Sequence, residues 1–303
     1  KNFNVIGDSL LYFEIKNEIK NYNADIVHTH GAKSGFYGRL AANSLKVRSI
    51  VHTFHGHLFH SYYNKFFTSI LKNIERSLAG ITSIIIAISK SQALELSEVY
   101  KIASVQKINT ISLGIDINTL HDEENILRTQ FRNKYCITGN EIIIAIVGRI
   151  APVKNPELFI QAAAIILKQK IASVRFFIIG DGYLKNNIKE VCNKLNVTWS
   201  EGADKNADVI FTSWIENIAP ALNGIDILAS TSNNEGTPMS IIEAQCCGKP
   251  VVATNVGGVA DTMLDGETGF LTEPNNAELI ADKFKILVQD NLLRNEMGLK
   301  AKA

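Results

Sequence analysis

Residues 225–244 read IDILASTSNNEGTPMSIIEA, and this stretch decides the fold. Its first five residues form an apolar run that is typical of a short buried strand, and its last seven follow the apolar spacing of a helix. Thr237 is a suitable N-cap and Pro238 suits the first helical position, so we expect the helix to begin there. A strand that runs through a short loop into a helix is the repeating unit of parallel α/β folds.

Two carboxylates frame this loop. Glu235 lies before the expected cap, and Glu243 lies six residues beyond it, about 9 Å further along the helix axis. The helix start between them offers unpaired N–H groups and a positive dipole end, which together favour a phosphate. Two hydroxyl-accepting carboxylates beside a phosphate site suit a ligand with a sugar at each end of a diphosphate, such as a nucleotide sugar.

The same alternation of β-branched runs and amphipathic stretches fills most of the chain, which predicts two Rossmann-like α/β domains with parallel sheets. Strands are expected at 24–30, 49–54, 84–88, 108–111, 141–147, 174–179, 209–211, 225–229 and 251–253, and helices at 8–22, 38–45, 62–79, 90–99, 125–135, 157–168, 184–195 and 238–247. We expect an N-terminal domain over 1–120, a linker over 121–138 and a C-terminal domain over 139–303. Ligands of such folds bind beyond the carboxyl ends of the strands.

The composition is that of an ordinary globular protein, with 303 residues, 46% hydrophobic and 20% charged. A net charge of +1 gives no global field for nucleic acid, so we expect no nucleic-acid partner. Four unpatterned cysteines argue against a disulfide framework and for a reducing cytosolic setting. The chain begins without Met and ends inside a helical pattern, so we expect it to be part of a longer protein.

Three glycine-containing loops follow predicted strands. Gly148–Pro156 carries Arg149 and Lys154, which suit diphosphate oxygens but would also fit an ordinary surface loop. Gly180-Asp181-Gly182 lacks the third glycine of a dinucleotide fingerprint, so we expect a tight turn that lets a ligand or a neighbouring loop come close. Gly257 and Gly258 permit the same close approach, or a plain turn.

Histidines gather in the first domain. His28, His30, His52, His55, His57 and His60 lie within 33 positions. A metal site is one interpretation, but no cysteine lies near and Asp25 is the only carboxylate in those loops, so we expect no metal. The other interpretations are packing at strand ends, or polar side chains that point into the crevice between the domains.

Helix 62–79 mixes aromatic and aliphatic residues with lysine and arginine. A basic amphipathic helix either covers a sheet or lies on a membrane surface, and both interpretations stay open. No apolar run approaches the ~20 residues needed to span a bilayer.

Several motifs together resemble the retaining glycosyltransferases of family 4, in particular members that assemble bacterial polysaccharides. They are NEGTPMSIIEA at 234–244, GKPVVAT at 248–254, VGG at 256–258, VGR at 147–149 with Lys154-Asn155, DGETGFL at 265–271, DIVHTH at 25–30 and HTFHGH at 52–57. The resemblance implies a GT-B fold, in which two Rossmann-like domains face each other across a cleft and the second holds the donor. It also implies that the family's first strand and its C-terminal helix are cut here.

The resemblance assigns roles to particular residues. Arg149 and Lys154 would neutralise the donor diphosphate, and Glu243 would accept hydrogen bonds from the ribose. Glu235 would bind the transferred sugar with the N–H groups of Gly236 and Thr237, while Gly257 and Gly258 complete the donor side. His55 would face the reacting sugar, so the expected catalytic set is His55, Glu235, Arg149 and Lys154. His28, His30, Gly31 and His57 would lie on the acceptor side.

The implied reaction is metal-independent and needs no cofactor, so the cations and the helix dipole would stabilise the departing phosphate. The expected partners are a nucleotide-sugar donor, by default a uridine nucleotide, and a glycan or lipid-linked acceptor. One of the two interpretations of helix 62–79 adds a membrane surface. We expect a cytoplasmic protein that can work at the inner face of the cell membrane.

Two other functions are compatible with the same fold. A nucleotide-sugar epimerase would need catalytic carboxylates in the first domain, where Asp25 is the one candidate in the loops. A non-catalytic binding module would keep nucleotide-sugar affinity without sugar transfer, and an assay of donor hydrolysis or transfer distinguishes it.

Overall fold

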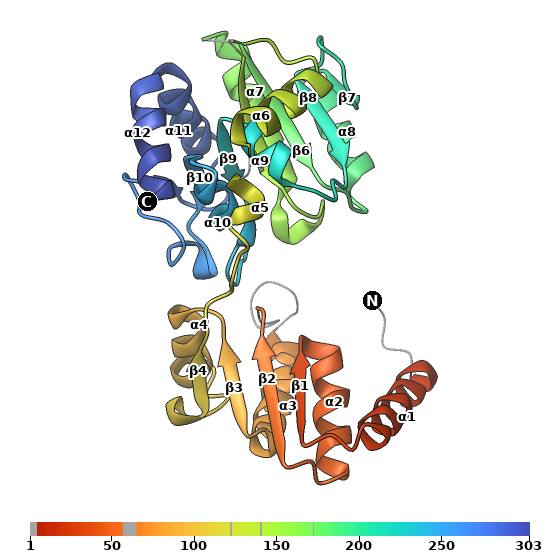
Figure 1. The fold of residues 1–303 in the computed structure, drawn as a ribbon. Coiled ribbons are helices and arrows are strands. Elements are labelled where there is room, and N and C mark those ends of the chain that lie inside the picture. Colours follow the sequence, from red (N-terminus) through yellow and green to blue (C-terminus); the bar gives the residue numbers. More distant parts are fainter. Residues whose placement is uncertain (1–4, 57–64, 122, 140, 172) are drawn as a thin grey trace. The chain divides into compact units, whose positions relative to one another are not determined.

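The computed structural model describes residues 5–56, 65–121, 123–139, 141–171 and 173–303 (Figure 1). The chain divides into two compact units, Lys1–Leu113 and Gly114–Ala303. Each unit is built on a sheet in which every paired strand runs parallel to its neighbours. The predicted α/β class with two parallel sheets is therefore confirmed.

The first unit has a four-stranded sheet in the order β1-β2-β3-β4. Its elements are α1 (Val5–Asn21), β1 (Ile26–His30), α2 (Ala32–Ser44), β2 (Ser49–Phe54), α3 (Lys65–Ile81), β3 (Ile84–Ala87), α4 (Lys90–Leu94), a π-helical turn (Glu95–Val99), a 3-10 turn (Val105–Lys107) and β4 (Ile108–Thr110). Residues 62–64 of the predicted helix 62–79 lie outside the described residues.

Helix α2 begins six residues before the predicted start at Gly38, because two glycines inside it serve packing and do not mark a boundary. A Cβ on Gly35 would lie 2.4 Å from the His52 ring, and one on Gly38 would lie 2.6 Å from Thr29. The bare backbone of α2 thus sits directly on β1 and β2, and this close packing fixes the histidine-bearing strands under the helix.

The second unit has a seven-stranded sheet in the order β11-β10-β9-β5-β6-β8-β7. Its strands are β5 (Ile142–Val147), β6 (Val174–Ile179), β7 (Trp199–Glu201), β8 (Val209–Ser213), β9 (Ile227–Ser230), β10 (Val251–Thr254) and β11 (Gly269–Thr272). Its helices are α5 (Asn118–His121), α6 (Glu124–Lys134), α7 (Pro156–Gln169), α8 (Lys185–Lys194), α9 (Ala219–Gly224), α10 (Met239–Cys246), α11 (Ala277–Gln289) and α12 (Asn291–Lys302), with 3-10 turns at Pro152–Lys154 and Gly257–Val259.

Successive residues of a strand point to opposite faces of the sheet, and helices cover both faces of this second sheet. In β5, Ile144 packs into the core under α7, α8 and α11, whereas Ile143 and Ala145 pack into the core under α6, α9 and α10 (Figure 1). The strands are therefore held in place by packing on both faces, and the loops at the strand ends carry polar residues that line a pocket.

The compact units divide at Leu113/Gly114, whereas the sequence suggested a linker over 121–138. Helix α6 lies within that stretch and packs on α9 in the second unit. Its Arg128 and Arg132 both pair with Asp226, at 2.7 and 3.2 Å. Two arginines of the expected linker are thus tied to the turn before β9.

Candidate functional site

Loops from the carboxyl ends of β5 and β9 are bonded to each other. Asn155 adopts left-handed backbone geometry (φ 45°) and caps α7, accepting a hydrogen bond from Leu158 N. The Thr231 hydroxyl donates to the carbonyls of Lys154 and Asn155, at 3.2 and 3.0 Å. The amide of Asn233 donates to Val153 O at 2.8 Å. These bonds fix the position of the loop that carries Lys154 relative to the loop that carries Glu235.

Glycines let two further loops approach closely. Gly257 has φ +54°, and a Cβ there would lie 2.0 Å from Glu235 O. The Gly258 amide donates to the same carbonyl at 3.2 Å. A Cβ on Gly180 would likewise lie 2.0 Å from Gly148 O. The predicted close approach of a neighbouring loop at Gly180 is confirmed, and at Gly257 the structure decides for close approach over a plain turn.

Lys154 and Glu235, 81 positions apart in sequence, form an ion pair. Lys154 Nζ lies 2.6 Å from Glu235 Oε1, and the two side chains are 29% and 11% exposed. The Ser232 hydroxyl donates to the same Oε1 at 2.5 Å. A cation and a carboxylate that were expected at one ligand therefore contact each other in the structure.

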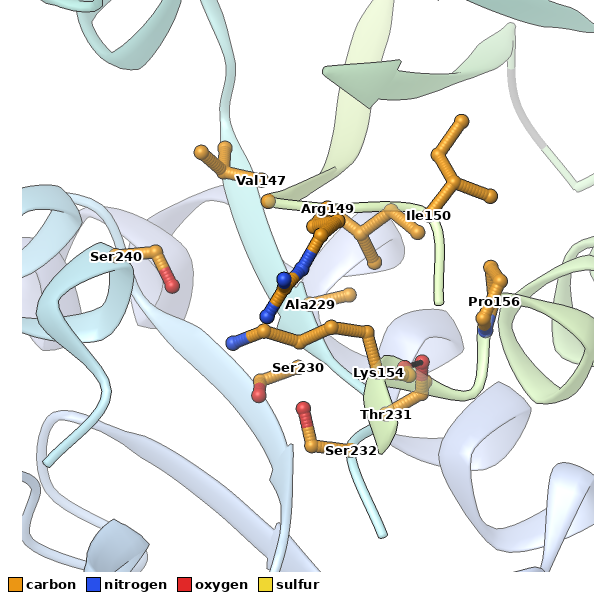
Figure 2. Close-up of a pocket in the computed structure, with 12 residues that line it drawn as sticks. Val147, Arg149, Ile150, Lys154, Pro156, Ala229, Ser230, Thr231, Ser232 and Ser240 are labelled. Atoms are coloured by element: carbon orange, nitrogen blue, oxygen red, sulfur yellow. Dashed lines mark hydrogen bonds between the residues drawn. The ribbon is translucent and has the colours of Figure 1, made fainter. Parts of the chain in front are cut away.

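The ion pair borders a pocket at the carboxyl ends of β5 and β9 (Figure 2). Lys154 lines it together with Arg149, which is exposed, and with the hydroxyls of Ser230, Ser232 and Ser240. In the view of Figure 2 the Arg149 and Lys154 side chains point in the same direction. Two cations and several hydroxyl donors in one pocket suit a phosphorylated ligand.

Helix α10 begins one residue later than predicted, so the N-cap assignment of Thr237 was wrong. Pro238 occupies the N-cap with extended geometry (φ −75°, ψ 98°), and Met239 is the first helical residue. The extended backbone at Pro238 keeps Thr237 outside the helix. Gly236 and Thr237 lie in the half-buried loop between Glu235 and this cap.

Glu243 lies on α10, three residues beyond Ser240, so the two share a helix face. Within the described part of the chain, no hydrogen bond or ion pair joins its carboxylate to another side chain. Burial raises the pKa of this carboxyl above its ordinary value of 4.5. The group is partly desolvated without a protein partner, which is the state expected of a carboxylate that awaits a ligand.

In the first unit, three of the predicted histidines lie together. His30 Nδ1 and His55 Nε2 are 2.8 Å apart, and the His28 and His30 ring centroids are 4.2 Å apart. His28 Nε2 lies 2.7 Å from the Thr53 hydroxyl. Burial, followed by the charge of the neighbouring imidazole of His30, lowers the pKa of both His28 and His55. Both rings are therefore neutral at pH 7 and act as hydrogen-bonding groups.

The other histidines of this region have different positions. His52 packs under α2, beside Thr29 at 2.9 Å, and burial lowers its pKa to about 3, so it is a neutral core residue. Gly31 (φ +71°) caps α2 directly after β1. His57 lies outside the described residues. His28, His30 and His55 are close, but within the described ranges no group of three or more His, Cys, Asp or Glu side chains could hold a metal ion.

Sequence reasoning missed the residues that support the ion pair. Ser232 bonds Glu235 directly, Thr231 and Asn155 hold the lysine loop, and Ser240 lines the pocket. A signal was available, since Thr231 and Ser232 lie just beyond the predicted strand 225–229 and Ser240 lies in the first turn of the next helix.

None of the helices in the described ranges has the length and hydropathy to cross a bilayer.

Comparison with protein families gives two matches. Residues 128–303 match the family model "Glycosyl transferases group 1", and residues 4–119 match the model "Glycosyltransferase Family 4". The histidines 28, 30 and 55 lie within the family 4 match, and the residues that line the pocket of Figure 2 lie within the group 1 match.

Individual relatives agree with these matches. The chain is 28% identical over 296 residues to the UDP-Gal:alpha-D-GlcNAc-diphosphoundecaprenol alpha-1,3-galactosyltransferase of Escherichia coli, covering 97% of this chain and 74% of that protein. It is 27% identical over 275 residues to the capsular polysaccharide biosynthesis glycosyltransferase CapM of Staphylococcus aureus, covering 90% of this chain and 70% of that protein.

A solved structure shares the fold. HepE of Anabaena, in complex with UDP and glucose, superposes with a TM-score of 0.80 at 21% identity, covering all of this chain and 78% of that one. The likeness confirms the predicted GT-B fold class.

Proposed function

We propose a donor, an acceptor class and a stereochemical course for this chain. The chain belongs to the group 1 glycosyltransferases, and a family 4 glycosyltransferase domain precedes its group 1 domain. It is a glycosyltransferase. The proposal is that it moves a sugar from a UDP-sugar to a glycan or a lipid-linked acceptor, with retention of anomeric configuration and without a metal.

One observation carries the proposal, namely the pocket that Arg149, Lys154 and serine hydroxyls line, with Glu235 paired to Lys154 beside it. Cations at this position stabilise the negative charge that develops on a departing diphosphate. The names of relatives support the donor and the acceptor, because one uses UDP-Gal and a diphosphoundecaprenol-linked sugar, and another was solved with UDP and glucose.

A donor panel tests the proposal directly. We would titrate UDP, GDP and ADP into the protein by calorimetry, with and without Mg²⁺, and repeat the preferred nucleotide with the Arg149→Ala protein. The expected result is metal-independent binding of UDP that the substitution weakens strongly. Binding of no nucleotide by a folded protein, or binding that requires Mg²⁺, would refute the proposed donor or the metal-independent course.

Glu243→Gln should weaken UDP-sugar binding by about 10-fold or more, because a hydrogen bond to a charged acceptor contributes about 1.5–3 kcal/mol. The proposal assigns Glu243 to the ribose hydroxyls, and the structure leaves its carboxylate available to a ligand. Glutamine keeps the size of the side chain and removes its charge. Unchanged calorimetric affinity would remove Glu243 from the donor site.

The same residue predicts a pH dependence. The raised pKa of Glu243 means that its carboxyl takes up a proton at a higher pH than an ordinary glutamate, whose pKa is 4.5. The charged form is the better acceptor, so affinity should fall as the pH is lowered towards that raised value and recover as it rises. The Glu243→Gln protein should lack this component. The measurement is the ratio of the two affinities across pH, and a constant ratio would contradict the assignment.

His55→Ala should reduce turnover by about 100-fold while leaving UDP affinity nearly unchanged, a size typical for loss of one group that stabilises a transition state. The proposal places the neutral His55 imidazole at the transferred sugar, away from the nucleotide. Turnover and UDP affinity are measured on the same preparation, so the affinity serves as the control. Full retained turnover would exclude His55 from the reaction.

Contact with a membrane remains part of the proposal. Along α3, Phe66 and Phe67 are 71% and 55% exposed, and Ile70 is 40% exposed. An apolar row of this kind on a helix that also carries lysine and arginine supports contact with an anionic lipid surface. Action at the inner face of a cell membrane would follow from such contact with a lipid-linked acceptor.

A further inference from the structure

A second polar cavity, of about 260 Å³, lies at the amino ends of β9 and β10. It is lined from α6, from the turns before the two strands, and from α12; Figure 1 labels these helices and strands. The pocket of Figure 2 lies at the carboxyl end of β9, so the two cavities lie at opposite ends of that strand. Nothing in the proposed transfer reaction uses this second cavity.

The acidic groups of the cavity are already neutralised. Asp226 accepts from Arg128 at 2.7 Å and from Arg132 at 3.2 Å, and its Oδ2 also accepts from the Ile143 amide at 2.9 Å. Glu124, at the rim, pairs with Lys302. Each carboxylate therefore pairs with a cation of its own, and Asp226 acts on Lys249 and Arg294 only at longer range.

Two cations in the cavity lack such a partner. Lys249 Nζ donates to the carbonyl of Asn223 at 2.9 Å, and Arg294 donates to Leu287 O at 2.6 Å and to Asn291 Oδ1 at 2.7 Å. All of these acceptors are neutral. Among the residues that the structure describes, no carboxylate lies within ion-pair distance of either group. The cavity thus has an excess of positive charge, although the whole chain carries only +1.

The half-buried Lys249 is the most informative of these groups. Burial, with the nearby charge of Arg128, lowers the pKa of Lys249 to about 8. Its ammonium has three N–H donors, and the bond to Asn223 accounts for one of them. The bond to the carbonyl of Asn223 near the end of α9 therefore uses only part of the hydrogen-bonding capacity of Lys249. An anion in the cavity would use the remaining donors and stabilise the charged form.

We propose that this cavity binds a small phosphate-bearing anion, held by Lys249 and Arg294, with Arg128 as a further cation in the lining. A phosphate oxygen accepts from both ammonium and guanidinium groups, and its charge offsets the excess of cations. Helix α10 runs from the pocket of Figure 2 to the turn that carries Lys249, so one helix links the two sites.

The test is calorimetric titration with inorganic phosphate, pyrophosphate and glycerol phosphate. Asn295 lines the cavity from the exposed face of α12, so Asn295→Glu adds a negative charge without removing a described contact. Asn187→Glu makes the same change at an exposed position on α8 and is the matched control. All proteins carry Arg149→Gln, which weakens anion binding at the pocket of Figure 2.

We expect phosphate binding that Asn295→Glu weakens by about tenfold or more and that Asn187→Glu leaves unchanged. Lys249→Gln should give the same loss, with thermal melting as the check on folding. Sedimentation with phosphatidylglycerol vesicles, compared between the Asn295→Glu and Asn187→Glu proteins, distinguishes a lipid headgroup in this cavity from a soluble anion, because contact through α3 is the same in both. Absence of binding to every probe, or equal affinity in the Asn295→Glu and Asn187→Glu proteins, would overturn the proposal.

Discussion

Lys154→Ala is expected to lower the transfer rate by about 10²–10³-fold, the range seen when one preorganised stabilising group is removed from a transition state. Two effects combine. The substitution removes a cation from the proposed position of the leaving diphosphate. It also leaves the Glu235 carboxylate, only 11% exposed, with the Ser232 hydroxyl as its remaining described partner. A carboxylate without its cation in this position would repel a diphosphate.

The matched control is Lys300→Ala, which makes the same change in net charge. Lys300 pairs with Glu296 at 2.8 Å, but the two side chains are 49% and 62% exposed, and such surface pairs contribute little. A double substitution, Lys154→Ala with Glu235→Ala, should be far from additive because the two groups interact directly. Equal rates for the Lys154→Ala and Lys300→Ala proteins would show that the pocket of Figure 2 does not hold the donor.

Gly257→Ala is expected to abolish most donor binding and to destabilise the second unit. The new methyl group would lie 2.0 Å from the backbone oxygen of Glu235, and backbone cannot yield as a flexible side chain can. The loop that carries Glu235 must then move, which breaks its alignment with Lys154. The left-handed backbone at φ +54° adds about 1–2 kcal/mol of strain for a residue with a Cβ.

Gly266→Ala separates these two effects. Gly266 also has a positive φ, +77°, but a Cβ there meets nothing within 4 Å. Both proteins should melt at a lower temperature than the parent chain, while only the Gly257→Ala protein should lose UDP affinity and turnover. If the two variants lose the same amount of donor affinity, the close approach of Gly257 to Glu235 has no functional role.

Much of the second unit could be predicted from the sequence, because its strands are continuous apolar runs bounded by turn residues. The predicted range 174–179 coincides with β6, for example. The errors have identifiable causes. The helix was predicted to start only at Gly38, whereas α2 begins at Ala32 and uses Gly35 and Gly38 to sit against His52 and Thr29. The short β7 and α9 were not predicted because three to six residues give too little periodicity.

The candidate site was predicted in its residues but not in its internal contacts. Arg149, Lys154 and Glu235 each stand just beyond a predicted strand, which is enough to expect them near one ligand. That Lys154 bonds Glu235 depends on β9 lying next to β5 in the sheet, an order that one sequence does not reveal. The buried support from Thr231 likewise follows from the pairing of strands and not from any local pattern.

The bond between Lys154 and Glu235 has a consequence for selectivity. In the free protein the carboxylate of Glu235 occupies the lysine and so acts as an internal competitor for it. A ligand that engages Lys154 must offer more negative charge than the single carboxylate that it displaces, and must give Glu235 hydroxyl donors in exchange. A diphosphate joined to a sugar satisfies both conditions at once. A free sugar or a lone nucleoside satisfies at most one, so we expect either to bind the empty site more weakly than a nucleoside diphosphate does.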